Sequence, residues 1–188
     1  RCLDYYRKLD INIKRLVETA GSHTDVIMTS DHGFGATTEI VYINEWLARR
    51  GYLEWANAAE QDDIGKLTAN RMKEHLGMVD WKNTIAFCPT PSSNAIYIKK
   101  DNGSGHGVKD SEYLEFCLNL KKELLAYRDS NGEAVIVGVD LNKLEGVPFV
   151  EPSPDITLRL RDGGFVSILK SSEVVSPRTH VDGTHRPN

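Results

Sequence analysis

The pattern of apolar positions along the chain predicts alternating helices and strands. From Leu3 to Ala20, apolar side chains recur at helical spacing, and the stretch stops at Gly21, which is typical of a helix that a glycine closes. The same spacing recurs further along the chain. It predicts helices at residues 42–53, ending at Gly51, at 62–77, ending at Gly77, and at 110–129.

Shorter apolar runs predict strands. Residues 24–29 (TDVIMT) are almost continuously apolar, as expected of a strand buried on both faces of a parallel sheet. Strands are also predicted at 83–88 and 94–100, separated by the turn residues PTPSS. Two more are predicted at 155–160 and 164–169, where the intervening RDGG is a hairpin signal. A further strand is predicted at 133–139.

These elements together predict an α/β protein with a mainly parallel sheet flanked by helices. The helix that ends at Ala20, a short loop and the strand at 24–29 make one α/β unit. The first pair of strands interrupts this order and indicates a small β-containing insertion. We expect approximate boundaries of 1–79 for the first part of the core, 80–150 for the insertion and 151–188 for the return to the core.

Composition and charge narrow the range of functions. Of the 188 residues, 40% are hydrophobic and 27% are charged, as in ordinary globular proteins. The net charge of −4 gives no reason to expect nucleic-acid binding, and we find neither a membrane-spanning run nor a signal peptide. The three cysteines lack a CxxC spacing, so neither a disulfide framework nor a thiolate zinc site is indicated, and a reducing compartment such as the cytoplasm is favoured.

The clearest chemical signal follows the predicted strand at 24–29. Asp31 and His32 stand where that strand should end, and open α/β sheets bind ligands beyond the carboxyl ends of their strands. A carboxylate and an imidazole, without a thiolate, suit a catalytic zinc or manganese ion. Gly33 and Gly35 would let the backbone turn sharply and leave room for a substrate. The alternative is that Asp31 caps the next turn and His32 is an ordinary polar loop residue.

Six segments, spread over nearly the whole chain, extend the evidence beyond Asp31 and His32. In chain order they resemble successive segments of the type I phosphodiesterases and nucleotide pyrophosphatases, a branch of the alkaline phosphatase superfamily. The SDHG and GTHRPN blocks are the specific parts of the resemblance, and the other segments agree with their order. The segments are TSDHGFG, INEWLARRGYL, VDWKNTIAFC, NAIYIK, GVPFVEPSPDITL and DGTHRPN.

The resemblance implies an alkaline phosphatase-like fold with two divalent metal ions, zinc or alternatively manganese, at the carboxyl ends of the sheet strands. Carried over to this chain, it makes Asp31 and His32 ligands of one ion and His185 a ligand of its neighbour. His180 precedes this histidine in the chain, and we do not expect it to bind metal.

Members of this family use a Ser or Thr hydroxyl that attacks phosphorus and gives a covalent phospho-enzyme. The resemblance puts that nucleophile and the remaining ligands upstream of the SDHG block, in sequence that these 188 residues do not contain. It therefore implies the C-terminal part of a phosphodiesterase or nucleotide pyrophosphatase, with about half of a two-metal site. Its substrate would be a small phosphoester or a nucleotide, and the fragment alone would be inactive.

Other interpretations stay open from the sequence. The chain could be a non-catalytic binding domain that keeps the fold, or a relative of the phosphomonoesterases or phosphomutases. CPTPSS (88–93) is similar to the sulfatase signature, but Thr90 and Pro91 stand where that signature has Pro and Ser, so a turn is expected. GSGHG (103–107) is a candidate anion-binding nest, with an ordinary surface loop as the alternative.

Overall fold

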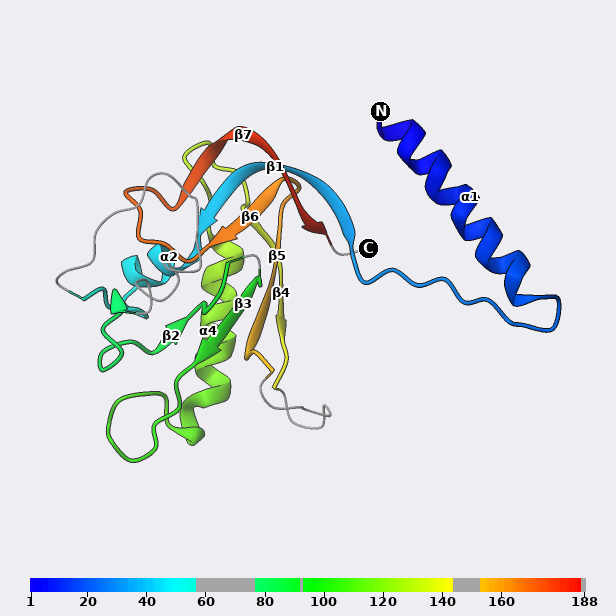
Figure 1. Ribbon diagram of the computed structural model, residues 1–188. Coiled ribbons are helices and arrows are strands. Elements are labelled where there is room, and N and C mark those ends of the chain that lie inside the picture. The colour runs from blue at the N-terminus through cyan, green and yellow to red at the C-terminus, as the bar shows by residue number, and fades with distance from the viewer. Residues whose placement is uncertain (57–76, 92, 144–152, 187–188) are drawn as a thin grey trace. The chain divides into compact units, whose positions relative to one another are not determined.

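The computed structural model describes residues 1–56, 77–91, 93–143 and 153–186 (Figure 1). They form two compact units, each described by itself. The first unit is Arg1–Gly33 and the second contains Phe34–Arg186. No helix in the described part of the chain is long and apolar enough to cross a membrane. The predicted division into residues 1–79, 80–150 and 151–188 stays a prediction.

The first unit contains one long helix. Helix α1 (Cys2–Ala20) ends at Gly21, which has a φ of 85°, so the predicted helix and its glycine end are confirmed. The strand predicted at 24–29 is wrong, because these residues form neither helix nor strand and Ile27 is 84% exposed. A strand needs neighbours for its backbone hydrogen bonds, and the described residues of this unit offer none.

The described residues of the second unit form two sheets, of which the first has three strands in the order β6-β1-β7 (Figure 1). Strand β1 is central and pairs with β6 in parallel, from Glu39 opposite Gly164 to Tyr42 opposite Ser167. The sharp turn expected at Gly33 and Gly35 is wrong, because both residues lie in the extended β1. The strands are β1 (Gly33–Tyr42), β6 (Gly164–Ser167) and β7 (Val175–Arg186).

The second sheet has four strands in the order β2-β3-β5-β4, and every neighbouring pair is antiparallel. The α/β class is therefore confirmed, but the expectation of a mainly parallel sheet is not. The predicted strands at 83–88, 94–100 and 133–139 are present. The bounds are β2 (Ala86–Phe87), β3 (Ala95–Ile98), β4 (Ile136–Leu141) and β5 (Ile156–Leu160).

The predicted hairpin between residues 155–160 and 164–169 is wrong, although both strands exist. Strand β5 belongs to the four-stranded sheet and β6 to the three-stranded one. The turn between them is held by β1 instead, because the Gly163 carbonyl accepts hydrogen bonds from the backbone N–H groups of Thr38 (2.9 Å) and Glu39 (3.2 Å). The chain therefore crosses from one sheet to the other in three residues.

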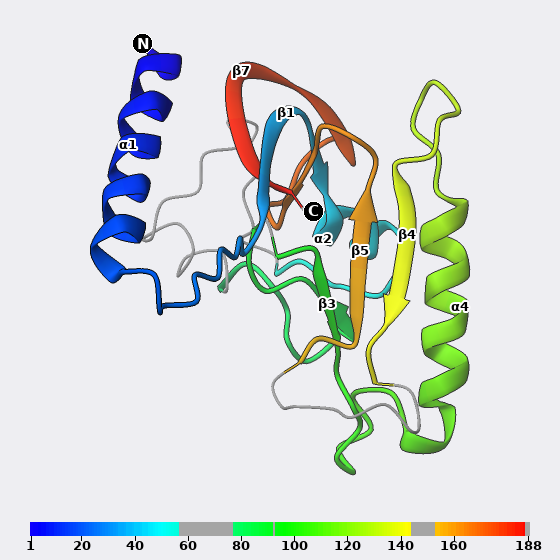
Figure 2. The ribbon, with the colours of Figure 1, turned by 90° about the vertical axis from the view of Figure 1, so that its right-hand side faces the viewer.

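Helices cover and connect the two sheets. Helix α4 lies alongside β4 (Figure 2) and buries Cys117, Leu120 and Leu124 in a core shared with the four-stranded sheet. The helix predicted at 62–77 lies, apart from Gly77, outside the described residues. In the described part of the chain the remaining helices are α2 (Ile43–Arg49), a 3-10 turn at Asp110–Glu112, and α4 (Tyr113–Ala126). Helices α2 and α4 lie within the predicted ranges 42–53 and 110–129, but α2 ends at Arg49, before the predicted end at Gly51.

A buried amide at the start of α2 joins the two sheets. The Asn44 side chain is 2% exposed and accepts a hydrogen bond from the Cys88 N–H at 2.7 Å. It donates to the carbonyls of Cys88 (3.0 Å) and Ile168 (3.2 Å). Cys88 follows β2 in one sheet and Ile168 follows β6 in the other, so one side chain satisfies backbone groups of both.

Replacing Asn44 with Ala should destabilise the second unit strongly. The change removes three hydrogen bonds and leaves buried backbone groups of Cys88 and Ile168 without these partners, at ~1–3 kcal/mol per group. We expect the free energy of unfolding, measured by urea titration, to fall by at least ~3 kcal/mol. The exposed Asn119→Ala in α4 is the matched control and should change it by less than ~0.5 kcal/mol. Equal effects of the two substitutions would contradict the junction role of Asn44.

Candidate metal centre

Asp31 and His32 form a local pair just before β1. The imidazole Nδ1 of His32 donates a hydrogen bond to the Gly33 carbonyl at 2.9 Å, so Nε2 is the ring nitrogen on the side of Asp31. That Nε2 lies 3.4 Å from Oδ2 of Asp31. The hydroxyl of Ser30 donates to the His32 carbonyl at 3.0 Å and so helps to hold the backbone of the pair. The two ligand atoms that the motif predicts therefore face each other.

Their separation fits one metal ion. Zinc binds nitrogen and oxygen ligands at about 2.0–2.2 Å, so two tetrahedral ligands lie about 3.4 Å apart. A carbonyl acceptor on the second imidazole nitrogen is also the usual way in which a metal-binding histidine is oriented. The Asp31 side chain is 87% exposed and that of His32 is 35% exposed, so both are accessible. Within the described residues, no group of three potential ligand side chains comes together.

His185 lies near the end of β7, and its side chain is outside the described part of the structure. Strand β7 runs beside β1 (Figures 1 and 2). Near one end of the pair the Tyr42 N–H donates to the Val174 carbonyl at 2.8 Å, and near the other the Phe34 ring lies against Gly183. The two strands are therefore antiparallel. Their pairing brings Phe34, the residue after SDHG, next to Gly183, the first residue of GTH.

Two other sequence signals prove to be structural. In GSGHG, the N–H groups of Gly103 and Gly105 both donate to the Asp101 carboxylate at 2.9 Å. The donors that would make an anion nest are thus engaged by the loop's own acid. In CPTPSS, the thiol of Cys88 is buried and donates to the Thr90 carbonyl at 3.4 Å, as expected of a turn. Burial raises the pKa of the Cys88 thiol to about 11.

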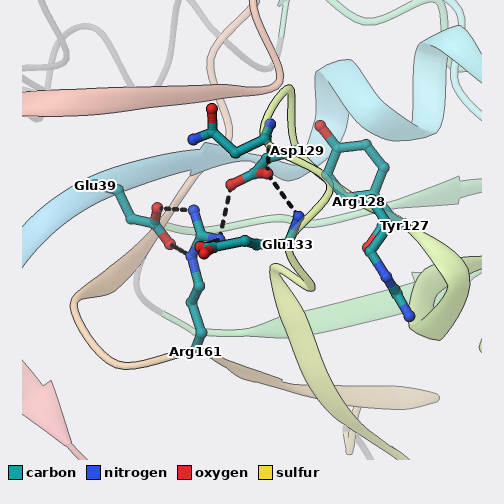
Figure 3. Close-up of polar contacts among 7 residues, drawn as sticks. Glu39, Tyr127, Arg128, Asp129, Glu133 and Arg161 are labelled. Carbon is teal, nitrogen blue, oxygen red and sulfur yellow. Dashed lines mark hydrogen bonds and ion pairs between the residues drawn. The ribbon is translucent and has the colours of Figure 1, made fainter.

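A charged cluster that the sequence did not predict lies in the second unit (Figure 3). The Arg161 guanidinium makes a bidentate pair with the Glu39 carboxylate, at 2.8 and 2.5 Å. It also contacts Asp129 at 2.7 Å and Glu133 at 3.3 Å. A cavity of about 360 Å³ borders this cluster, and Arg49, Tyr127 and Glu173 are among its other lining residues. These residues come from distant parts of the chain and form no motif.

The cluster is a structural ion-pair network. The hydrogen bonds that Arg161 donates to the Glu39 carboxylate raise the pKa of Arg161, which stays charged and is fully engaged by carboxylates. The backbone N–H of Glu133 and then the Arg161 side chain lower the pKa of Asp129 below its usual value. Through Arg161, the network connects Glu39 in β1 to Asp129 in the turn after α4. It therefore restrains the position of β1.

The comparison with known families decides the identity of the chain. A model of the type I phosphodiesterase / nucleotide pyrophosphatase family matches residues 1–186. The chain belongs to this family. The match spans both SDHG and GTH, so the resemblance predicted from the motifs is confirmed. Membership of the type I phosphodiesterase family indicates a hydrolase of the phosphodiesterase or nucleotide pyrophosphatase type. No curated protein and no solved structure matches the chain.

The buried thiol in this phosphodiesterase family member should be inert. With a pKa of about 11 and an exposure of 2%, Cys88 should react at pH 8 at least ~100-fold more slowly than the exposed Cys2, because the thiolate is the reactive form. Mass spectrometry after timed alkylation, followed by proteolysis, measures both rates in one sample. Comparable labelling of the two residues would show that the CPTPSS turn does not protect its thiol.

The lowered pKa of Asp129 predicts a pH-dependent contribution to stability. An unfolded Asp has a pKa of ~3.9, so the carboxylate stabilises the fold fully above that value and loses its effect as pH falls through the lower native pKa. Asp129→Asn should therefore lower the free energy of unfolding at pH 7, and this deficit should shrink towards pH ~3. Asp140→Asn, which breaks a half-exposed ion pair with Arg159, should cost at most ~0.5 kcal/mol at pH 7. A deficit for Asp129→Asn that is the same at all pH values would contradict this linkage.

Proposed function

We propose that this family member is part of a metal-dependent phosphoric ester hydrolase with a two-metal site. Asp31 and His32 hold one divalent ion, zinc or alternatively manganese, and His185 holds its neighbour. The contact between Phe34 and Gly183 carries this proposal. His32 precedes Phe34 by two residues and His185 follows Gly183 by two, so at most ~7 Å of extended chain separates either histidine from the contact.

The side chains of the SDHG block are suited to this role. The hydrogen bond from His32 Nδ1 to the Gly33 carbonyl selects the tautomer that presents Nε2, and the Asp31 carboxylate lies beside it. These are the hard and borderline donors that zinc and manganese accept. When bound, two such cations stabilise the attacking and leaving oxygens of a displacement at phosphorus and neutralise charge on the phosphoryl group.

The family and the donor set support a substrate with phosphoryl oxygens. A small phosphoester or a nucleotide offers phosphoryl oxygens, which hard cations bind well. We propose that a Ser or Thr nucleophile and the remaining ligands come from sequence N-terminal to the SDHG block, outside these 188 residues. This chain then supplies about half of the two-metal site.

Substitution of His185 tests the assignment of the second ion. In the full-length protein, His185→Ala should remove about one equivalent of bound metal and lower phosphodiester hydrolysis at least ~100-fold, since one ion of the pair is lost. The exposed His180→Ala, in the same strand, is the control and should change neither. Metal content is measured by inductively coupled plasma mass spectrometry after gel filtration. Full metal content and activity in His185→Ala would exclude this histidine as a ligand.

Comparing the 188-residue chain with the full-length protein tests the division of the site. The chain alone should hydrolyse bis-p-nitrophenyl phosphate no faster than buffer with added zinc, because it lacks the nucleophile, whereas the full-length protein should turn it over. The assay follows release of p-nitrophenolate in the presence of zinc or manganese. Turnover by the purified chain would mean that the nucleophile lies within these residues. A full-length protein that binds metal without turnover would instead be a non-catalytic binding domain.

A further inference from the structure

The cavity of about 360 Å³ beside the Arg161 network is built from several separate segments of the second unit. Strand β1, the end of α2, the turn after α4, the crossing after β5 and the segment around the start of β7 each contribute side chains to its wall. Pockets that bind small organic ligands usually measure about 300–1,000 Å³. This cavity therefore has room for one small ligand.

Charges of both signs line the cavity. The guanidinium of Arg161 lies between the carboxylates of Glu39 and Asp129 (Figure 3). Arg49 adds a second guanidinium and Glu173 a further carboxylate. An anion or a cation bound here would each meet fixed groups of its own sign, whereas a neutral ligand would not. The described residues also nowhere bring three potential metal ligands together. The wall therefore favours an uncharged ligand.

The hydrogen-bonding groups that the cavity has to spare are mostly neutral. Among the described residues, the hydroxyl groups of Tyr127 and Ser130 and the side-chain amide of Asn131 have no hydrogen-bond partner. Burial raises the pKa of the Tyr127 hydroxyl, which therefore stays protonated and can both donate and accept. The Tyr127 ring, Val175 and Pro177 add an apolar surface beside these groups.

These properties fit a ring that carries several hydroxyl groups. Each hydroxyl of such a ligand can donate to a carboxylate and accept from a guanidinium or from tyrosine, so it uses both signs of charge in one site. The C–H groups of the ring can pack on the aromatic and aliphatic part of the wall. We propose that this cavity binds a neutral, polyhydroxylated ring of the size of a monosaccharide. The inference goes beyond the proposed function and does not rest on it.

Saturation-transfer difference NMR on the full-length protein tests the inference with matched probes. D-glucose, D-ribose and myo-inositol are neutral, whereas D-glucosamine and D-glucuronate add an ammonium or a carboxylate to the glucose ring. At least one neutral probe should bind saturably in the millimolar range, and more tightly than both charged probes, because a charge would be brought next to fixed charges of its own sign. The inference is overturned if no neutral probe binds, or if a charged probe binds most tightly.

Variants of the lining residues connect binding with this cavity. Tyr127→Phe keeps the ring and removes one hydroxyl, so it should weaken binding of the neutral probe about 3–10-fold, the usual effect of one hydrogen bond. Ser130→Trp fills the cavity from an exposed position and should abolish binding without lowering the melting temperature. The matched control is Ser104→Trp, in an exposed loop outside the cavity, which should bind the probe like the parent. Parental affinity in both Tyr127→Phe and Ser130→Trp would show that the probe binds elsewhere and would overturn the inference.

Discussion

The second unit depends on the buried amide of Asn44. The three-stranded and the four-stranded sheet meet beside α2. Without the Asn44 side chain, the N–H and carbonyl of Cys88, after β2, and the carbonyl of Ile168, after β6, would lose these hydrogen bonds. Asn44 supplies both an acceptor and two donors, which no apolar residue of the same size can do. Because α2 follows β1 directly, the same amide also fixes the end of the strand that leads away from the SDHG block.

Strand β1 is in consequence held from several directions. Its C-terminal end continues into α2, its middle is paired with Arg161 through Glu39, and its start touches β7 through Phe34. This arrangement gives a physical role to residues that carry no chemistry. Glu39, for example, holds the backbone of β1 through its ion pair with Arg161.

The sequence predicted well those features whose signals are local. Apolar spacing and terminal glycines located α1, α2 and α4, and the motifs identified the family. Strands β1 and β7 were missed because Thr37, Thr38, Pro177 and Gly183 break any apolar alternation, and their pairing partners lie far away in sequence. The apolar run at 24–29 suggested a strand, but pairing partners, which a single run cannot reveal, decide whether a strand forms. The contacts of Phe34 and Arg161 were likewise invisible, because they arise only from the tertiary arrangement.

The crossing at Arg161–Gly163 has a mechanical consequence. Only three residues connect β5 in one sheet to β6 in the other, and the Gly163 carbonyl accepts two backbone hydrogen bonds from β1. The sheets cannot slide past one another or open like a hinge without breaking these bonds and the Arg161 pairs. We therefore expect the two sheets to open together, so that the amides of β5 and β6 exchange their hydrogens through the same opening reaction.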